Sequence, residues 1–210
     1  MIGYPMRAAG QRRRPPQPAP SPAPTPAAGL IPMLDISSNN ADLFGLISTL
    51  QPAILLVRAY LSIEDVSQDW TRNAIALGLQ FQLPIAYYWW PYADIDGAWA
   101  ANEATGLVTS CCMPAWGMQD VEQYTDGSTP AGPEIAAGIS ALRAALIRPV
   151  IYSSVSQWAL VPNPCDLTHV DELVADYNGN ADLNVAPFGN GCVFGHQWTS
   201  TPADLSVIAA

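Results

Sequence analysis

Two acidic residues separated by a single position are the clearest candidates for chemistry in this sequence of 210 residues. Asp120 and Glu122 lie near the end of residues 117–123, a segment that predicts a strand. Side chains alternate in direction along a strand, so both carboxyl groups are expected to point to the same side. Two carboxyl groups that lie close together have different pKa values, because the charge of one disfavours ionisation of the other. One protonated and one charged carboxyl group are what glycoside cleavage requires.

Polar and aromatic side chains at the ends of other predicted strands give this pair more weight than an isolated acidic strand end would have. Asp35 ends an apolar run and is expected to face the same opening, with Asp176 and Asp204 around it. Arg58 and Tyr152 end two further runs. Flat aromatic rings can pack against sugar rings, although roughly half of those present are expected in the core instead. This aromatic set is Tyr87, Tyr88, Trp89, Trp90 and Trp198.

Short apolar runs alternate with helical segments from residue 33 onward, which indicates parallel strands joined by crossover helices. The predicted strands are residues 33–36, 53–59, 83–90, 117–123, 149–152, 172–176 and 193–198. The predicted helices are residues 41–50, 67–77 (ended by Gly78), 97–109 and 133–147. A doubly wound sheet and a closed barrel both fit this order.

The polar clusters at nearly every strand end favour the barrel, because its carboxyl face gathers side chains from many strands. No Gly-x-Gly-x-x-Gly segment or phosphate-binding lysine loop supports a nucleotide-binding sheet. The predicted fold class is therefore α/β, a small, imperfect TIM-like (β/α) barrel over residues 33–210.

Residues 1–32 differ in composition from the rest and predict an extended proline-rich arm or linker. They hold nine of the twenty prolines, four of the eight basic residues and no acidic residue. Such a chain can neither donate a ladder of hydrogen bonds nor bury much surface. Residues 33–210 contain the remaining four arginines and all eighteen acidic residues, so this part of the chain has a net negative charge. Nucleic-acid binding by this acidic part is not expected, because it would repel phosphates.

Several other classes of site and location are also not expected. No apolar run approaches the length of a membrane span, so no membrane partner is predicted. Prolines follow the first arginines where a signal peptide would have an apolar segment, so secretion by that route is not predicted. The four cysteines have no short spacing to His169 or His196, which argues against structural zinc and favours small buried thiols. His196 is expected to be a structural donor.

Taken in order, these segments resemble the family 25 glycoside hydrolases, the muramidases of bacteria and their phages that cut the glycan of peptidoglycan. Residues 35–37, Asp-Ile-Ser, are similar to the signature of that family's first strand. Residues 120–122 are similar to the Asp-x-Glu that ends its fourth strand. The other similar segments are residues 54–59, 83–88, 149–153, 174–177, 197–198 and 204–205.

The resemblance implies a flattened barrel with an acidic groove, in which Glu122 is the general acid. Asp120 and Asp35 would assist by charge or orientation, without a metal or organic cofactor. The bond cut would join N-acetylmuramic acid to N-acetylglucosamine. The residues expected to bind the glycan are Asp204, Asp176, Arg58, Tyr87, Tyr88, Trp89, Tyr152 and Trp198. Two segments depart from the family pattern, residues 116–119 before Asp120 and Trp89-Trp90 at the end of the third strand.

Two functional hypotheses follow from the barrel and the arm. The first is a phage-encoded peptidoglycan hydrolase, attached to other virion proteins through residues 1–32. It would be located in the virion, or in the host cytoplasm until lysis. The second is a catalytically silent barrel that serves as a structural or cell-wall-binding protein of the tail or capsid. The carboxyl groups favour the first hypothesis, and the arm favours attachment in either.

Overall fold

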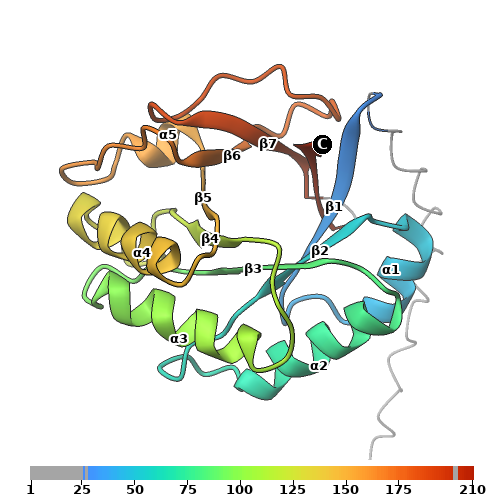
Figure 1. Ribbon diagram of the computed structural model, residues 1–210. Helices are drawn as coiled ribbons and strands as arrows, with labels where there is room; N and C mark the ends of the chain where they lie inside the picture. Colours follow the sequence, from blue (N-terminus) through green and yellow to red (C-terminus); the bar gives the residue numbers. More distant parts are fainter. Residues whose placement is uncertain (1–25, 27, 201–202) are drawn as a thin grey trace, which may run out of the picture.

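The strands of the protein close into one barrel, as the computed structural model shows for residues 26, 28–200 and 203–210 (Figure 1). The strands are β1 (Leu30–Ile36), β2 (Ile54–Arg58), β3 (Ile85–Trp89), β4 (Gly117–Asp120), β5 (Pro149–Ser153), β6 (Asp171–Ala175), β7 (Cys192–Thr199) and β8 (Asp204–Ala209). The helices are α1 (Leu43–Leu50), α2 (Gln68–Gln80), α3 (Gly97–Thr109), α4 (Gly132–Ala144) and α5 (Val155–Trp158). The predicted barrel class is confirmed.

The last strand departs from the all-parallel arrangement that the sequence predicted. Strands β1 to β7 pair in order and in parallel, but β8 runs antiparallel to both β7 and β1. Only a short connection separates β7 from β8, and a parallel pair would need a crossover of a dozen residues or more. This strand was not among the predicted ones. Its reversal places its first residue, Asp204, at the same end of the barrel as the last residues of the parallel strands.

Every second strand residue fills the interior of the barrel with apolar side chains, as the period of two requires. This interior cluster contains Met33, Ile54, Leu56, Ala86, Tyr88, Trp116, Met118, Val150, Tyr152, Leu173, Ala175, Phe194 and Ile208. The interior is therefore a packed core below its carboxyl end, and the polar residues that continue the same alternation lie at that end.

Helices α1 to α4 follow one another around the right, lower and left parts of the barrel, whereas the long connection between β6 and β7 passes along its top (Figure 1). Side-chain caps fix where two of these helices begin. The carboxylate of Asp96 accepts a hydrogen bond from the Trp99 amide at 2.7 Å, and the Ser67 hydroxyl accepts one from the Asp69 amide at 3.2 Å. These caps satisfy amides that a helix start leaves free. Helix α2 packs against β2 and β3, and α3 packs against β3.

The start of β1 and the end of α2 differ from the predicted boundaries. Strand β1 begins at Leu30, so residues 30–32 of the predicted arm belong to the barrel, while residues 1–25 and 27 lie outside the described part. Helix α2 continues past Gly78, which was expected to end it. A Cβ at Gly78 would lie 2.7 Å from Ile85 Cδ1 and 2.8 Å from Leu55 Cδ2. This glycine therefore serves close packing of helix on sheet.

All four cysteines are free thiols, but none is fully buried and Cys192 is exposed, so their predicted burial is wrong. In the described part of the chain, no helix combines the length and the apolar character needed to cross a bilayer.

Candidate active site

Four carboxyl groups gather at the carboxyl end of the barrel. Asp35 on β1 lies directly opposite Asp204 on β8 in the antiparallel register. Asp120 ends β4, and Glu122 follows it two residues later. The charges of these groups act on one another, Asp204 and Asp120 on Asp35, and Glu122 and Asp204 on Asp120. The structure thus brings together the three residues predicted to be catalytic and one predicted to bind the glycan.

Burial is the largest cause that raises the pKa of each of these carboxyl groups. The pKa of Asp35 is well above its usual value, because burial is reinforced by the charges of Asp204 and Asp120. The pKa of Asp120 is also well above its usual value, first through burial and then through Glu122. Burial and Asp204 raise the pKa of Glu122. Such shifts keep protons on carboxyl groups at a pH where exposed carboxyl groups have lost them.

Three neighbours oppose this effect and hold individual carboxyl groups. The indole Nε1 of Trp90 donates a hydrogen bond to Asp120 Oδ2 at 2.5 Å. The positive charge of Arg58 lowers the pKa of both Asp35 and Asp120. A hydrogen bond from the Tyr88 side chain lowers the pKa of Asp35. These interactions favour the charged forms of Asp35 and Asp120, whereas burial favours the protonated form of all four carboxyl groups.

Three buried atoms of this site have no hydrogen-bond partner among the described residues. They are Asp35 Oδ1, Asp120 Oδ1 and Arg58 Nε. Buried polar atoms in proteins are nearly always satisfied, and exceptions call for a specific explanation. Their concentration at one end of the barrel fits a place where a substrate or water supplies the missing partner.

Cavities adjoin this end of the barrel on two sides. One cavity of about 360 Å³ is lined by Arg58, Tyr60, Glu64 and Tyr92, among others. Another, of about 590 Å³, lies at the ends of β5 and β6 and is lined in part by Asp176. Arg58 and Asp176, both predicted to bind the glycan, thus line cavities, whereas none of the four clustered carboxyl groups lines either cavity.

Tyr152 extends the site on β5, where it is the register partner of Asp120. Its hydroxyl lies 3.1 Å from the hydroxyl of Tyr177, an exposed residue after β6. Burial raises the pKa of Tyr152, and the charges of Asp120 and Glu122 add to the effect. Tyr152 is thus next to the carboxyl groups as predicted, whereas Tyr177 was not singled out in the sequence.

Three of the aromatic residues predicted to bind the glycan are elsewhere. Tyr87 and Trp89 are fully buried and face outward, between the barrel and its helices, where the Tyr87 hydroxyl lies 2.6 Å from Thr105 Oγ1. Trp198 belongs to the same outer cluster. Alternation along β3 is the reason, since it puts Tyr88 and the following Trp90 on the interior side. That alternation was the signal available in the sequence for choosing Trp90 over Trp89.

Asp176 and His196 lie near the end of β6, but one is exposed and the other is buried. Asp176 is exposed, and its Oδ2 accepts a hydrogen bond from Asn178 Nδ2 at 3.2 Å. His196 is fully buried, with Nε2 2.6 Å from the Asp176 carbonyl oxygen and Nδ1 2.8 Å from that of Asp182. The histidine thus ties the segment after β6 to β7, which agrees with the predicted structural role. Within the described residues, no group of three or more His, Cys, Asp or Glu side chains is arranged to hold a metal ion.

The fold is similar to that of several solved cell-wall hydrolases. The LytC autolysin of Streptococcus pneumoniae, solved with a synthetic peptidoglycan ligand, matches with a TM-score of 0.65 and 19% identity over 85% of this chain and 46% of LytC. A family 25 glycosyl hydrolase of Bacillus anthracis matches with 0.63 and 13%, over 86% of this chain and 89% of that one. The spore cortex lytic enzyme SleM of Clostridium perfringens matches with 0.67 and 16%, over 88% and 69%.

These similarities concern the fold. The chain spans less than half the length of LytC. No protein-family model and no curated protein sequence matches it. The structural similarity nevertheless extends over 85–88% of this chain in these three comparisons. The chain therefore has the fold of the family 25 glycoside hydrolases.

Proposed function

We propose that the protein is a glycoside hydrolase that cleaves the glycan strands of peptidoglycan as an N-acetylmuramidase. The observation that carries this proposal is the cluster of Asp35, Asp120, Glu122 and Asp204 at the carboxyl end of a family 25 type of barrel. In such barrels the carboxyl end is where active sites are built. The peptidoglycan ligand in the LytC structure supports the substrate class.

Glu122 is the general acid in this proposal. Burial and the charge of Asp204 raise its pKa, so that it holds a proton for transfer. That proton passes to the glycosidic oxygen as the bond between this oxygen and the anomeric carbon breaks. The positive charge that develops on the sugar is stabilised by Asp120 or by the substrate's own acetamido group. Water then adds to the anomeric carbon, and its proton returns to a carboxylate.

The decisive experiment measures reducing ends released from purified peptidoglycan by the full chain and by Glu122→Gln. The amide keeps the shape of the side chain but has no proton to donate, so release is expected to fall by about 10²-fold to 10⁴-fold. Circular dichroism verifies that both proteins are folded. Equal release by the two proteins would remove Glu122 from the mechanism, and no release by the folded wild type from several cell walls would refute the hydrolase.

A role in a phage particle is a separate part of the proposal, and it is supported by the composition of residues 1–32. We propose that this proline-rich, arginine-bearing segment attaches the barrel to other virion proteins. Mass spectrometry of purified particles should then detect the intact chain but lose it when residues 1–25 are deleted. The alternative function is a silent structural or wall-binding barrel. It would show the same attachment, with peptidoglycan retained in a pull-down and no reducing ends released.

A further inference from the structure

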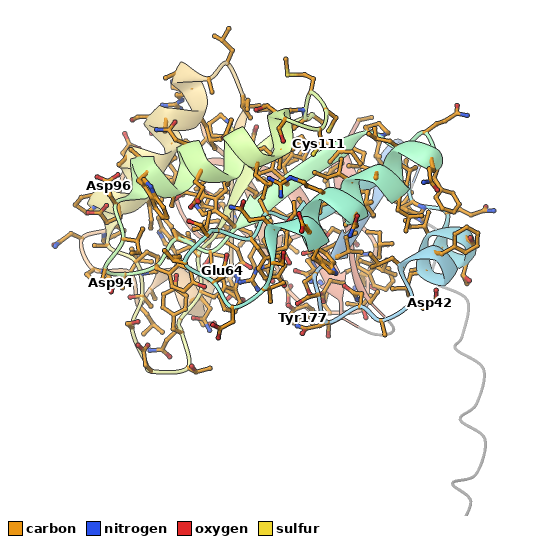
Figure 2. The ribbon with its side chains drawn as sticks, turned by 90° about the horizontal axis from the view of Figure 1, so that it is seen from below. Asp42, Glu64, Asp94, Asp96, Cys111 and Tyr177 are labelled. Carbon is orange, nitrogen blue, oxygen red and sulfur yellow. The ribbon has the colours of Figure 1, made fainter. Side chains whose placement is uncertain are left out.

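Glu64 lies in the segment between β2 and α2 (Figure 2). It is not part of the carboxyl cluster, but its side chain is only 6% exposed. Its carboxylate is held by three donors. Oε1 accepts hydrogen bonds from Arg58 Nη2 at 2.6 Å and from the Tyr92 hydroxyl at 3.0 Å. Oε2 accepts one from the Leu61 amide at 2.5 Å. This buried group has no role in the mechanism derived above.

The partner of Glu64, Arg58, is itself packed between aromatic rings. Its guanidinium carbon lies 4.3 Å from the centre of the Trp90 ring and 4.6 Å from that of Tyr60. A guanidinium over an aromatic face is attracted by the ring's quadrupole, and the attraction is stronger away from water. Arg58 therefore fixes the plane of the Trp90 ring, provided that its own position is fixed.

A second set of contacts leads from Glu64 to the same ring. Tyr92, which donates to Glu64, stacks on Tyr124 with ring centres 5.3 Å apart and an angle of 9° between the planes. Tyr124 in turn contacts Trp90 at 5.9 Å. Glu64 thus holds Arg58, which packs directly against Trp90, and Tyr92, which reaches Trp90 through Tyr124.

Trp90 transmits this placement to the reacting groups, because its indole Nε1 donates to Asp120 Oδ2. We propose that Glu64 is a positioning residue of the active site. It holds Arg58 and Tyr92 so that Trp90 keeps its hydrogen bond to Asp120. The inference deepens the proposed function, on which its kinetic part rests, while the geometry can be tested without catalysis.

The first test follows the Trp90 indole N–H resonance with pH, in protein labelled with ¹⁵N-tryptophan and assigned through Trp90→Phe. Protonation of Asp120 changes the acceptor of this N–H, so the resonance reports the titration midpoint. The charged and titratable groups that face Asp120 or Arg58 are Asp35, Glu122, Asp204, Glu64, Tyr60, Tyr88, Tyr92, Tyr124, Tyr152 and Tyr177.

The direction of the shift separates positioning from a plain charge effect. Removing the negative charge of Glu64 would by itself lower the midpoint of Asp120. Releasing Arg58 from its place beside the carboxyl groups raises it, by about 0.5 on the pH scale or more. We expect Glu64→Gln to raise the midpoint, and Glu64→Asp, which keeps the charge but is too short to keep all three hydrogen bonds, to raise it as well. An unchanged or lowered midpoint in a folded variant would overturn the proposal.

Glu103→Gln is the matched control. Glu103 Oε1 accepts from the Ser62 amide at 3.3 Å, so it contacts the same segment as Glu64, but it has no contact with Arg58. In Glu103→Gln, the titration midpoint of the Trp90 resonance and the hydrolytic activity should equal those of the wild type.

The kinetic test uses peptidoglycan as substrate. Glu64→Gln should lower kcat about tenfold or more with little change in KM, and the acid limb of its pH profile should move upward with the resonance. The double variant with Trp90→Phe should lose little more than Trp90→Phe alone, since both act through one hydrogen bond. An additive loss would contradict the proposed route. If the wild type shows no hydrolysis, the proposed function fails, and the resonance still decides the role of Glu64.

Discussion

Two of the regions in which the protein buries carboxyl groups are built in opposite ways. Glu172 on β6 is fully buried, and its oxygens accept hydrogen bonds from the backbone amides of Phe188 at 2.8 Å, Gly189 at 3.1 Å and Gly191 at 2.6 Å. Asp35 and Asp120, at the carboxyl end of the barrel, each keep one buried oxygen without a partner among the described residues. Both oxygens of Glu172 have hydrogen-bond donors, whereas Asp35 and Asp120 each keep an acceptor oxygen unpaired.

This difference teaches that burial of an acidic residue does not by itself indicate a reactive site. The amides around Glu172 belong to the connection before β7, so this carboxylate organises a loop that would otherwise have unsatisfied amides. The active-site cluster forgoes such partners, and burial together with mutual repulsion raises its pKa values. Stability is thus gained in the first region and given up in the second.

The largest change in stability is expected when Glu172 loses one of its acceptor oxygens. Glu172→Gln replaces one acceptor oxygen by an amide nitrogen, which leaves at least one buried backbone amide without a partner. The free energy of unfolding should fall by about 2–3 kcal/mol. This corresponds to a melting temperature lower by about 5–10 °C for a protein of this size. Thermal denaturation measures the change, and a melting temperature equal to that of the wild type would show that the comparison is mistaken.

Neutralising a carboxyl group of the unsatisfied region should change the free energy of unfolding in the opposite direction and by a smaller amount. Asp35→Asn keeps the shape of the side chain and removes a charge whose burial disfavours the folded state. We expect the free energy of unfolding at pH 7 to rise by about 1–2 kcal/mol, while hydrolysis decreases. The gain should vanish near pH 4, where Asp35 is already protonated. A variant less stable than the wild type at pH 7 would mean that the Asp35 charge stabilises the fold.

The smallest effect is expected in the pH dependence of stability. Because the folded pKa values of Asp35, Asp120 and Glu122 are raised, the folded state holds more protons than the unfolded state above about pH 4. Stability should therefore rise as the pH falls from 7 toward 5. Below pH 4 the trend reverses, since hydrogen bonds with Thr168 and Asn190 lower the pKa of Asp166 to about 2. Urea titrations at pH 3, 4, 5, 6 and 7 should locate this maximum, with a shallower slope between pH 5 and 7 for Asp35→Asn.

Much of the barrel was predictable because its strands are short, apolar and regularly separated by helices. The seven predicted strands correspond to β1 to β7, and alternation correctly placed Asp120 and Glu122 together. The same rule applied to residues 87–90 would have separated Tyr88 and Trp90 from Tyr87 and Trp89. Tyr87 and Trp89 were therefore wrongly predicted to bind the glycan, although the alternation that places them on the outer side was present in the sequence.

Other features depend on contacts that no local pattern encodes. Strand β8 pairs antiparallel with β1, and this pairing joins the two most distant strands of the chain. Glu64 and Glu172 are single acidic residues in polar surroundings, and only the folded chain shows that three donors converge on each. Tyr177 lies in an irregular segment, so its proximity to Tyr152 had no periodic signal.

The pairing of β1 with β8 also bears on the order of events during synthesis. Asp35 leaves the ribosome well before its neighbour Asp204, because β2 to β7 are all translated between them. Until β8 has been added, β1 and β7 each keep an open edge that can pair with another chain. A nascent protein of this fold must therefore wait in an incomplete and aggregation-exposed form, with its acidic centre unassembled, until its final strand arrives.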